Sequence, residues 1–302
     1  MTDSPDTTAV RVGCIGLGNM GAPMAQRLLG RPGGLTVLDT RPEAVAPLVE
    51  AGASSAASPA ELAAECGIVS VTVLDDAQVR EVVTGRDGLL STARPGTVVA
   101  IHSTISDTTA VELAELCASR NVDLVDAPVS GGAPGAKNGT LAVMVGASDD
   151  AFAKIREPFG HFASLVVHAG PVGSGTRMKL ARNLLHFVSF TAATEAQRLA
   201  EAAGLDITEL GKVVRHTDAI TGGAGAIMWR ESTSPLAPED SWFPIFSHVR
   251  ALGEKDLSLA LELGDRLGVE LPLGTRALAD LGPGLGVGPG DVAQTRSRKE
   301  HA

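Results

Sequence analysis

Several features of secreted, membrane-spanning and nucleic-acid-binding proteins are missing from this sequence of 302 residues. Its three cysteines, Cys14, Cys66 and Cys117, form no C-x-x-C pair, so buried, reduced thiols are expected. No run reaches the roughly 18 apolar residues that span a bilayer, and the N-terminus lacks the apolar core of a signal peptide. The formal net charge is -10, without a dense basic cluster. A cytoplasmic protein that binds neither nucleic acid nor a membrane is therefore predicted.

Metal-ligand patterns are also missing. The seven histidines are scattered and show no H-E-x-x-H or comparable spacing, so no metal site is predicted. His102 and His168 end predicted strands, where structural roles are favoured over catalytic ones.

An alternation of short apolar runs with helical patterns fills the first part of the chain. The runs bounded by Gly, Pro or Asp predict strands, and the longer periodic segments predict helices. This order predicts an α/β fold with a parallel, doubly wound sheet of the Rossmann type, covered by helices on both faces. The predicted strands span 12–15, 35–38, 68–74, 97–101, 122–127, 141–145 and 165–168, and the predicted helices 20–29, 42–50 and 108–119.

The second part of the chain shows helical patterns and no strand pattern, so an all-α domain is expected. Its predicted helices span 178–203, 207–216, 246–267 and 272–279. The predicted organisation is a disordered N-terminus over 1–10, an α/β domain over 11–174, a helical domain over 175–281 and a flexible tail over 282–302.

The glycine pattern after the first predicted strand is typical of a dinucleotide-binding turn. Gly16, Gly18 and Gly21 form G-x-G-x-x-G between an apolar strand and a helix. Gly16 permits the tight turn, Gly18 lets a pyrophosphate approach the backbone, and Gly21 lets the helix pack closely on the strand. The helix N-terminus offers free N–H groups to the phosphates. The intervening residues expected to line the cofactor with these glycines are Leu17, Asn19 and Met20.

An acidic residue ends the next strand, as this kind of turn requires. Asp39 follows Gly16 by 23 residues and can accept hydrogen bonds from the ribose hydroxyls of NAD. Its charge would repel the 2′-phosphate of NADP, whereas Arg41, two residues later, could hold that phosphate. NAD is therefore the predicted cofactor, and NADP stays the alternative.

A second glycine-containing segment, Asp126-Ala-Pro-Val-Ser-Gly-Gly132, follows the fifth predicted strand. Ligands bind at the carboxyl ends of the strands in sheets of this class. The Ser130 hydroxyl and the amide N–H groups of Gly131 and Gly132 suit a carboxylate. A turn that needs glycine for backbone reasons alone is the other interpretation.

A lysine and an asparagine stand four residues apart near the domain boundary. Lys179 and Asn183 therefore share a face of the long predicted helix. A desolvated lysine in a cleft can serve as an acid or a base. A solvated surface lysine is the other interpretation of the same residue.

Together these motifs resemble the β-hydroxyacid dehydrogenase family, which includes 3-hydroxyisobutyrate dehydrogenase, tartronate semialdehyde reductase and relatives of 6-phosphogluconate dehydrogenase. The resemblance covers about residues 10 to 275. It rests, in order along the chain, on Gly16-Leu-Gly-Asn-Met-Gly21, the turn His102-Ser-Thr-Ile-Ser106, Asp126-Ala-Pro-Val-Ser-Gly-Gly132, Gly175-x-x-x-Lys179-x-x-x-Asn183 and Lys255-Asp256-Leu257.

The resemblance implies a role for each matching residue. Lys179 would be the catalytic acid/base and Asn183 would position the substrate beside it. The carboxylate would be held by Ser130, Gly131 and Gly132. Such an enzyme interconverts a small β-hydroxy acid and its semialdehyde or keto acid, of the 3-hydroxyisobutyrate or tartronate semialdehyde type, and forms a homodimer or homotetramer. The remaining cofactor contacts that the resemblance implies are Val73, Leu74, Thr104 and Lys255.

Some features depart from the family pattern. The chain has no tyrosine, so any pocket tyrosine of relatives is absent, and an unusual loop over 221–246 contains Trp229 and Trp242. Two alternative functions are kept. The first is an imine reductase of the same architecture. Imine reductases usually have another residue in place of the family lysine, so the presence of Lys179 argues against this function. A non-catalytic dinucleotide-binding regulator would bind NADH without hydride transfer.

Overall fold

The computed structural model describes residues 10–228 and 230–288. Contacts divide the chain into two compact units between Arg182 and Asn183, within helix α8 (Ser174–Ala202). The predicted domain boundary at 174–175 lies at the first residues of this helix. Residues 1–9 of the predicted disordered N-terminus and 289–302 of the predicted tail lie outside the described residues, as does Trp229.

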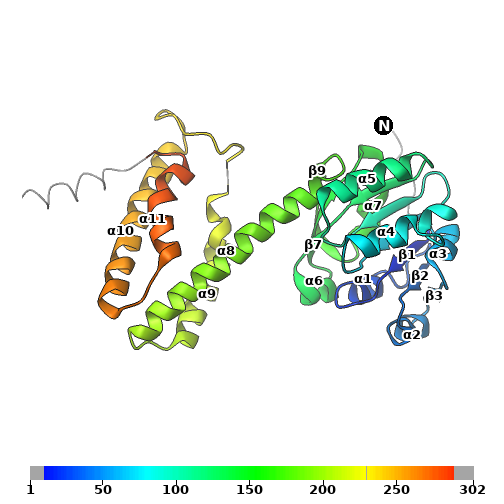
Figure 1. Cartoon of the computed structure of the whole chain (residues 1–302), viewed down its shortest axis with the longest axis horizontal. Coiled ribbons are helices and arrows are strands. Elements are labelled where there is room, and N and C mark those ends of the chain that lie inside the picture. Colours follow the sequence, from blue (N-terminus) through cyan, green and yellow to red (C-terminus); the bar gives the residue numbers. More distant parts are fainter. Residues whose placement is uncertain (1–9, 229, 289–302) are drawn as a thin grey trace, which may run out of the picture. The chain divides into compact units, whose positions relative to one another are not determined.

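The first unit is built on a nine-stranded sheet in the order β3-β2-β1-β4-β5-β6-β8-β7, with β9 paired to β8. The first six strands are parallel wherever they pair. They are β1 (Val12–Ile15), β2 (Leu35–Leu38), β3 (Ser54–Ser55), β4 (Ile68–Val71), β5 (Val98–Ile101) and β6 (Asp123–Asp126). The Rossmann-type arrangement predicted from the sequence is thereby confirmed (Figure 1).

The far side of the sheet differs from the purely parallel prediction. Strand β8 (Leu141–Gly146) runs antiparallel to β6 and to β7 (Val129–Ser130), whereas β9 (Ala163–Gly170) is parallel to β8. The connection after β6 folds its own short strand β7 against β8. It therefore does not form the long crossover that a parallel neighbour requires.

Helices cover both faces of the sheet, because alternate strand residues point to opposite sides. In β5, Val98 and Ala100 belong to one buried cluster, and Val99 and Ile101 belong to the other. The first face carries α1 (Gly21–Arg27), α2 (Pro42–Glu50), α6 (Gly132–Asn138) and α7 (Asp149–Phe159), and the second carries α3 (Pro59–Glu65), α4 (Asp76–Thr84) and α5 (Asp107–Ala118).

His102 lies directly after β5 and is buried among aromatic rings. Its imidazole can donate from Nδ1 to the Ala127 carbonyl and accept at Nε2 from the Ser70 hydroxyl, and it packs against Phe159 and Phe162. Burial lowers the pKa of His102 to about 4, although the Ala127 carbonyl opposes this shift. The ring is therefore neutral near pH 7 and joins neighbouring strand ends, as expected of a structural residue.

The second unit consists of helices and loops, with no strand among its described residues. Besides the end of α8, it contains α9 (Ile207–Thr221), the 3-10 turn η2 (Gly223–Ile227), α10 (Phe243–Leu267) and α11 (Pro272–Leu285). Helix α11 includes four residues, 282–285, that the sequence analysis assigned to the tail. The expected all-α region is confirmed.

A buried carboxylate joins two of these helices. Glu195 on α8 accepts hydrogen bonds from the backbone N–H groups of Leu273 (2.8 Å) and Gly274 (2.9 Å) in the first turn of α11. The first N–H groups of a helix have no partner within the helix, so this carboxylate satisfies two of them. None of the described helices is long and apolar enough to span a membrane.

Candidate active site

The carboxyl ends of the parallel strands meet at one edge of the sheet. Strand β1 leads into Gly16, β2 into Asp39, β4 into Val73 and β5 into Ser103. Strand β6 ends at Asp126, beside the end of β5. This edge therefore gathers all the predicted site segments of the first unit.

The glycine turn has the close contacts that its residue types require. Gly16 has φ +87, and a Cβ there would lie 2.2 Å from the Thr72 carbonyl oxygen. A Cβ on Gly21 would lie 1.8 Å from the Gly16 oxygen. A Cβ on Gly18 would meet no atom of the described residues within 4 Å, apart from its chain neighbours. Gly18 thus faces the open space that a pyrophosphate needs, and the turn fits a dinucleotide.

Asp39 is held directly beside this turn. Its carboxylate accepts from the Leu17 N–H at 2.6 Å and from the backbone N–H of Arg41 at 2.9 Å. The Arg41 guanidinium also pairs with it at 3.1 Å. Burial raises the pKa of Asp39, but hydrogen bonds from the Arg41 side chain and the Leu17 N–H outweigh it and bring the pKa below its ordinary value. Asp39 is therefore an ionised carboxylate, paired with a cation, directly beside the glycine turn.

Two neighbouring turns form another part of this edge. The Ser103 hydroxyl accepts from the Val73 N–H at 2.9 Å and donates to the Val73 carbonyl at 2.7 Å. Leu74 is 80% exposed, and Thr104 is exposed as well. The predicted cofactor contacts Val73, Leu74 and Thr104 thus lie on two turns that one serine clamps together. Ser103 was not among the cofactor contacts predicted from the sequence.

The Lys179 amine contacts the segment that follows β6. Its Nζ donates to the Val129 carbonyl at 2.6 Å and to the Ser130 hydroxyl at 2.9 Å. The lysine is only 9% exposed, so it is not the solvated surface residue of the alternative interpretation. Burial, with a smaller contribution from Arg182, lowers its pKa below the ordinary value. Lys179 is therefore disposed to exchange a proton near neutral pH more readily than an exposed lysine.

The two glycines after Ser130 adopt conformations that favour glycine. Gly131 has φ +129 and Gly132 has φ +63, and both are exposed. The sequence predicted a carboxylate-binding segment here, with a turn as the alternative, and the structure shows that Gly132 also begins the short helix α6. Two exposed glycines therefore follow Ser130 directly.

The other two predicted site residues belong to the second unit. Asn183 lies one turn after Lys179 along α8 and is half-buried. Lys255 lies on α10, is exposed and pairs with Asp256 at 3.0 Å. Their predicted roles stay predictions.

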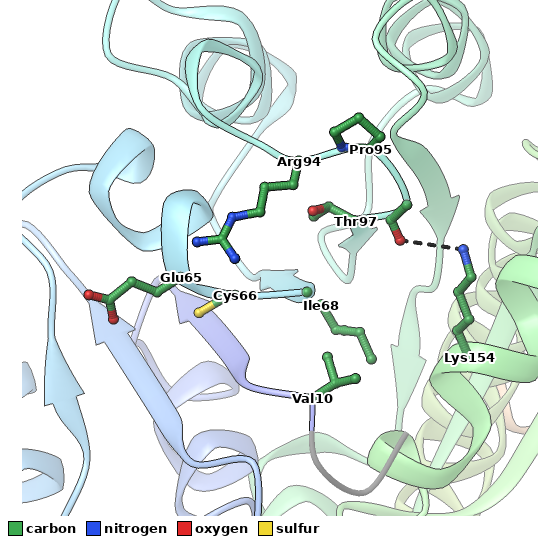
Figure 2. A pocket seen from close by; sticks show the side chains of 10 residues that line it. Val10, Glu65, Cys66, Ile68, Arg94, Pro95, Thr97 and Lys154 are labelled. Carbon is green, nitrogen blue, oxygen red and sulfur yellow. Dashed lines mark hydrogen bonds between the residues drawn. The ribbon is translucent and has the colours of Figure 1, made fainter. Parts of the chain in front are cut away.

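A separate pocket opens at the opposite edge of the sheet, beside the amino ends of β4 and β5 (Figure 2). It has a volume of about 290 Å³. Its cations are already engaged, because Lys154 pairs with Asp123 at 2.9 Å and Arg94 donates to the Ala64 carbonyl. The glycine turn and Lys179 do not line this pocket.

Side chains that could bind a metal ion do not cluster in the part of the chain that the structure describes. No group of three or more His, Cys, Asp or Glu side chains there could hold a metal ion.

Comparison with known protein families agrees with this geometry. Residues 11–170 match the NAD binding domain of 6-phosphogluconate dehydrogenase, and residues 173–281 match the domain described as NAD-binding of NADP-dependent 3-hydroxyisobutyrate dehydrogenase. The chain belongs to the β-hydroxyacid dehydrogenase family. It is an NAD(P)-dependent oxidoreductase, and named members of its family are dehydrogenases of hydroxy acids.

Individual relatives match over nearly the whole chain. An uncharacterised oxidoreductase of Mycobacterium tuberculosis is 62% identical over 287 residues, 95% of this chain and 96% of that protein. The 3-hydroxyisobutyrate dehydrogenase of Pseudomonas aeruginosa is 34% identical over 267 residues, 87% of this chain and 88% of that protein. A crystal structure of an oxidoreductase from Mycobacterium avium 104 is 57% identical with a TM-score of 0.89, covering 93% of this chain and 100% of that chain.

The glycine turn allows a matched pair of substitutions. Gly18→Ala adds a methyl group to open space, so the melting temperature should stay within about 2 °C of wild type, while the Kd for NADH rises roughly tenfold or more. Gly21→Ala drives a methyl group into the Gly16 carbonyl and should destabilise the protein by about 1–3 kcal/mol. Thermal unfolding and fluorescence titration with NADH measure both effects. Equal NADH affinity in Gly18→Ala and wild type would contradict this assignment of the turn.

Proposed function

We propose that this protein is an NAD-dependent dehydrogenase that interconverts a small β-hydroxy acid and its semialdehyde or keto acid, with Lys179 as general acid/base. The supporting observation is the buried Lys179 amine in contact with Ser130, the residue proposed to hold the substrate carboxylate. Relatives are named 3-hydroxyisobutyrate, 2-(hydroxymethyl)glutarate and L-serine dehydrogenases. Each of these three acids carries its hydroxyl on the carbon β to a carboxylate.

The hydrogen bonds of Lys179 define where its proton goes. A protonated amine has three N–H groups, of which two can donate to Val129 O and Ser130 Oγ. The third can donate to the carbonyl oxygen of the substrate during reduction. In the neutral amine, the two remaining N–H groups donate to the same two acceptors, and the lone pair points toward the substrate oxygen. The substrate hydroxyl then gives its proton to that lone pair during oxidation.

Ser130 connects the proton donor to the carboxylate site. A hydroxyl has one donor and two acceptor positions, so Ser130 can accept from Lys179 and still donate to a carboxylate oxygen. The N–H groups of Gly131 and Gly132 are proposed to hold the second oxygen. Asn183 is proposed to position the substrate from the second unit. Reacting groups held in this way gain from fixed orientation as well as from proton transfer.

The dinucleotide is proposed to lie along the turn Gly16–Gly21 with its ribose at Asp39. When bound, it supplies or accepts the hydride. Val73, Leu74 and Thr104 are proposed to contact its nicotinamide end, and Lys255 to reach it from the second unit.

Replacing the proton donor tests the mechanism. Lys179→Met removes the ammonium but keeps much of the volume, so kcat should fall at least about 100-fold, the lower range for general acid–base catalysis. The Kd for NADH should stay within about twofold, because the glycine turn is untouched. In wild type, kcat/KM for reduction should fall, and that for oxidation should rise, as pH increases through a Lys179 pKa below the ordinary lysine value. In Lys179→Met, both pH profiles should lose the change that the titration of Lys179 causes.

Substrate panels and a second lysine complete this test. The panel contains 3-hydroxyisobutyrate, glycerate, L-serine, tartronate semialdehyde and succinate semialdehyde. The control variant is Lys154→Met, which should turn these substrates over at the wild-type rate, because the ion pair of Lys154 lies at the opposite edge of the sheet. Normal turnover by Lys179→Met would remove Lys179 from the mechanism. Reduction of a cyclic imine with NADPH would favour the imine reductase alternative, whose members share this fold. NADH binding without turnover of any substrate would favour a regulator.

Cofactor preference tests the assignment of Asp39. NADH should give a higher kcat/KM than NADPH, because an ionised Asp39 accepts from ribose hydroxyls and repels a 2′-phosphate. Asp39→Ser should reduce this preference by roughly tenfold or more, equivalent to about 1.4 kcal/mol. Arg41→Ala should increase it, since the cation beside Asp39 is lost. A clear preference of wild type for NADPH would refute the NAD assignment.

The second unit exposes many large apolar side chains on its helices. An apolar surface of this kind marks an interaction site, and we propose that a second copy of the chain covers it in a homodimer or homotetramer. The exposed residues are Leu184, Leu185, Phe187, Val188 and Phe190 on α8, Val213, Val214 and Ile220 on α9, and Ile245, Leu252, Leu259 and Leu267 on α10.

Sedimentation equilibrium measures this association. Wild type should be a dimer or tetramer at micromolar concentration, and Phe187→Glu should weaken association at least about tenfold, because a charge would be buried at the interface. Gln197→Glu, an exposed position of the same helix, should leave it unchanged. A monomeric wild type would contradict the proposal.

A further inference from the structure

One fully buried carboxylate has no part in the proton transfer proposed for Lys179. Asp126 ends β6 and is 0% exposed. Its Oδ1 accepts from the Gly173 N–H at 2.7 Å and its Oδ2 from the Thr176 N–H at 2.6 Å. Both donors lie where α8 begins, so each carboxylate oxygen holds one backbone group of the helix start.

The packing around this carboxylate leaves little freedom. A Cβ on Gly175 would lie 2.3 Å from Met144 O and 2.6 Å from Asp126 O. A Cβ on Gly146, the partner of Asp126 in the sheet, would lie 2.2 Å from Asp126 Oδ1. The first turn of α8 therefore lies directly against the backbone of β6 and β8, and only glycine permits this approach.

The same short segment of chain meets α8 at a second point. Four residues after Asp126, Ser130 accepts from Lys179, which lies one turn beyond Thr176 on the helix. Three residues of α-helix rise only about 4.5 Å. A rotation of the helix by one residue, about 100° at 3.6 residues per turn, would carry Lys179 away from Val129 and Ser130.

We propose that Asp126 is a positioning residue for Lys179: its two hydrogen bonds to the start of α8 fix the register and rotation of the helix, and so hold the Lys179 amine on Val129 O and Ser130 Oγ. This inference rests on the proposed function, in which Lys179 exchanges the proton. Asp126 does not touch the amine through any hydrogen bond found among the described residues. It acts through the helix backbone.

Asp126→Asn keeps the size of the side chain but leaves one oxygen, so one of the two N–H groups loses its acceptor. Competitive labelling of lysines with acetic anhydride across pH, followed by mass spectrometry, reports the titration midpoint of Lys179 without substrate or cofactor. The midpoint should rise by roughly half a pH unit or more, because a displaced amine is less desolvated. With substrate, kcat should fall at least about tenfold while the Kd for NADH stays within about twofold.

Asp123→Asn is the matched control on the same strand. Asp123 pairs with Lys154 away from α8, so its loss should leave the Lys179 midpoint and kcat unchanged.

Asp126→Ser is the second variant, for use if Asp126→Asn does not fold. Its smaller side chain leaves room for a water molecule that can accept from the second N–H group. It should likewise raise the Lys179 midpoint and lower kcat. A folded Asp126 variant with altered stability but wild-type midpoint and kcat would overturn the proposal. Wild type without turnover would refute the proposed function alone, since the labelling result does not depend on it.

Discussion

Parallel strand pairing is the constraint on which the site depends. Because β1, β2, β4, β5 and β6 run in one direction, their carboxyl ends meet at one edge, and segments far apart in the sequence become neighbours. The glycine turn, Asp39, the Val73–Ser103 clamp and the segment after Asp126 each follow one of these strands. Each of these segments begins within two residues of the end of its strand. The chemistry at the edge can therefore rest on short turns whose positions the sheet determines.

Much of this arrangement could be predicted from the sequence, for identifiable reasons. Short apolar runs predicted seven of the nine strands with no end displaced by more than three residues, since buried parallel strands are continuously apolar. The two-residue strands β3 and β7 were missed. The glycine turn was recognisable because Gly16 and Gly21 meet backbone oxygens that any side chain would strike. The roles of Asp39, Ser130 and Lys179 came from motifs and from resemblance, and the structure adds their contacts rather than testing their roles.

Other features were not predicted, some because the sequence carries no local signal for them and some because a signal was present but not used. The antiparallel course of β8 depends on the path of the connection after β6, which local patterns do not encode. Helices α3, α4 and α7 were not predicted, although the capping residues Ser58, Asp75 and Ser148, which accept hydrogen bonds at their starts, were a usable signal. The Val129 carbonyl is a backbone acceptor that any residue would provide. For Asp126 a signal existed, since an acidic residue ending an apolar strand requires partners when buried, but those partners lie about fifty residues further along the chain.

The paired contacts of Lys179 have a stereochemical consequence. A carbonyl compound whose oxygen meets one fixed amine, and whose carboxylate meets Ser130 and the following glycines, is held at both ends. Two points of attachment still leave rotation about the line that joins them, so the place taken by the third substituent of the carbonyl carbon decides which face would receive the hydride. All these anchors lie within the first unit. Side chains that keep that substituent to one side of the line would consequently set the handedness of a chiral alcohol formed there.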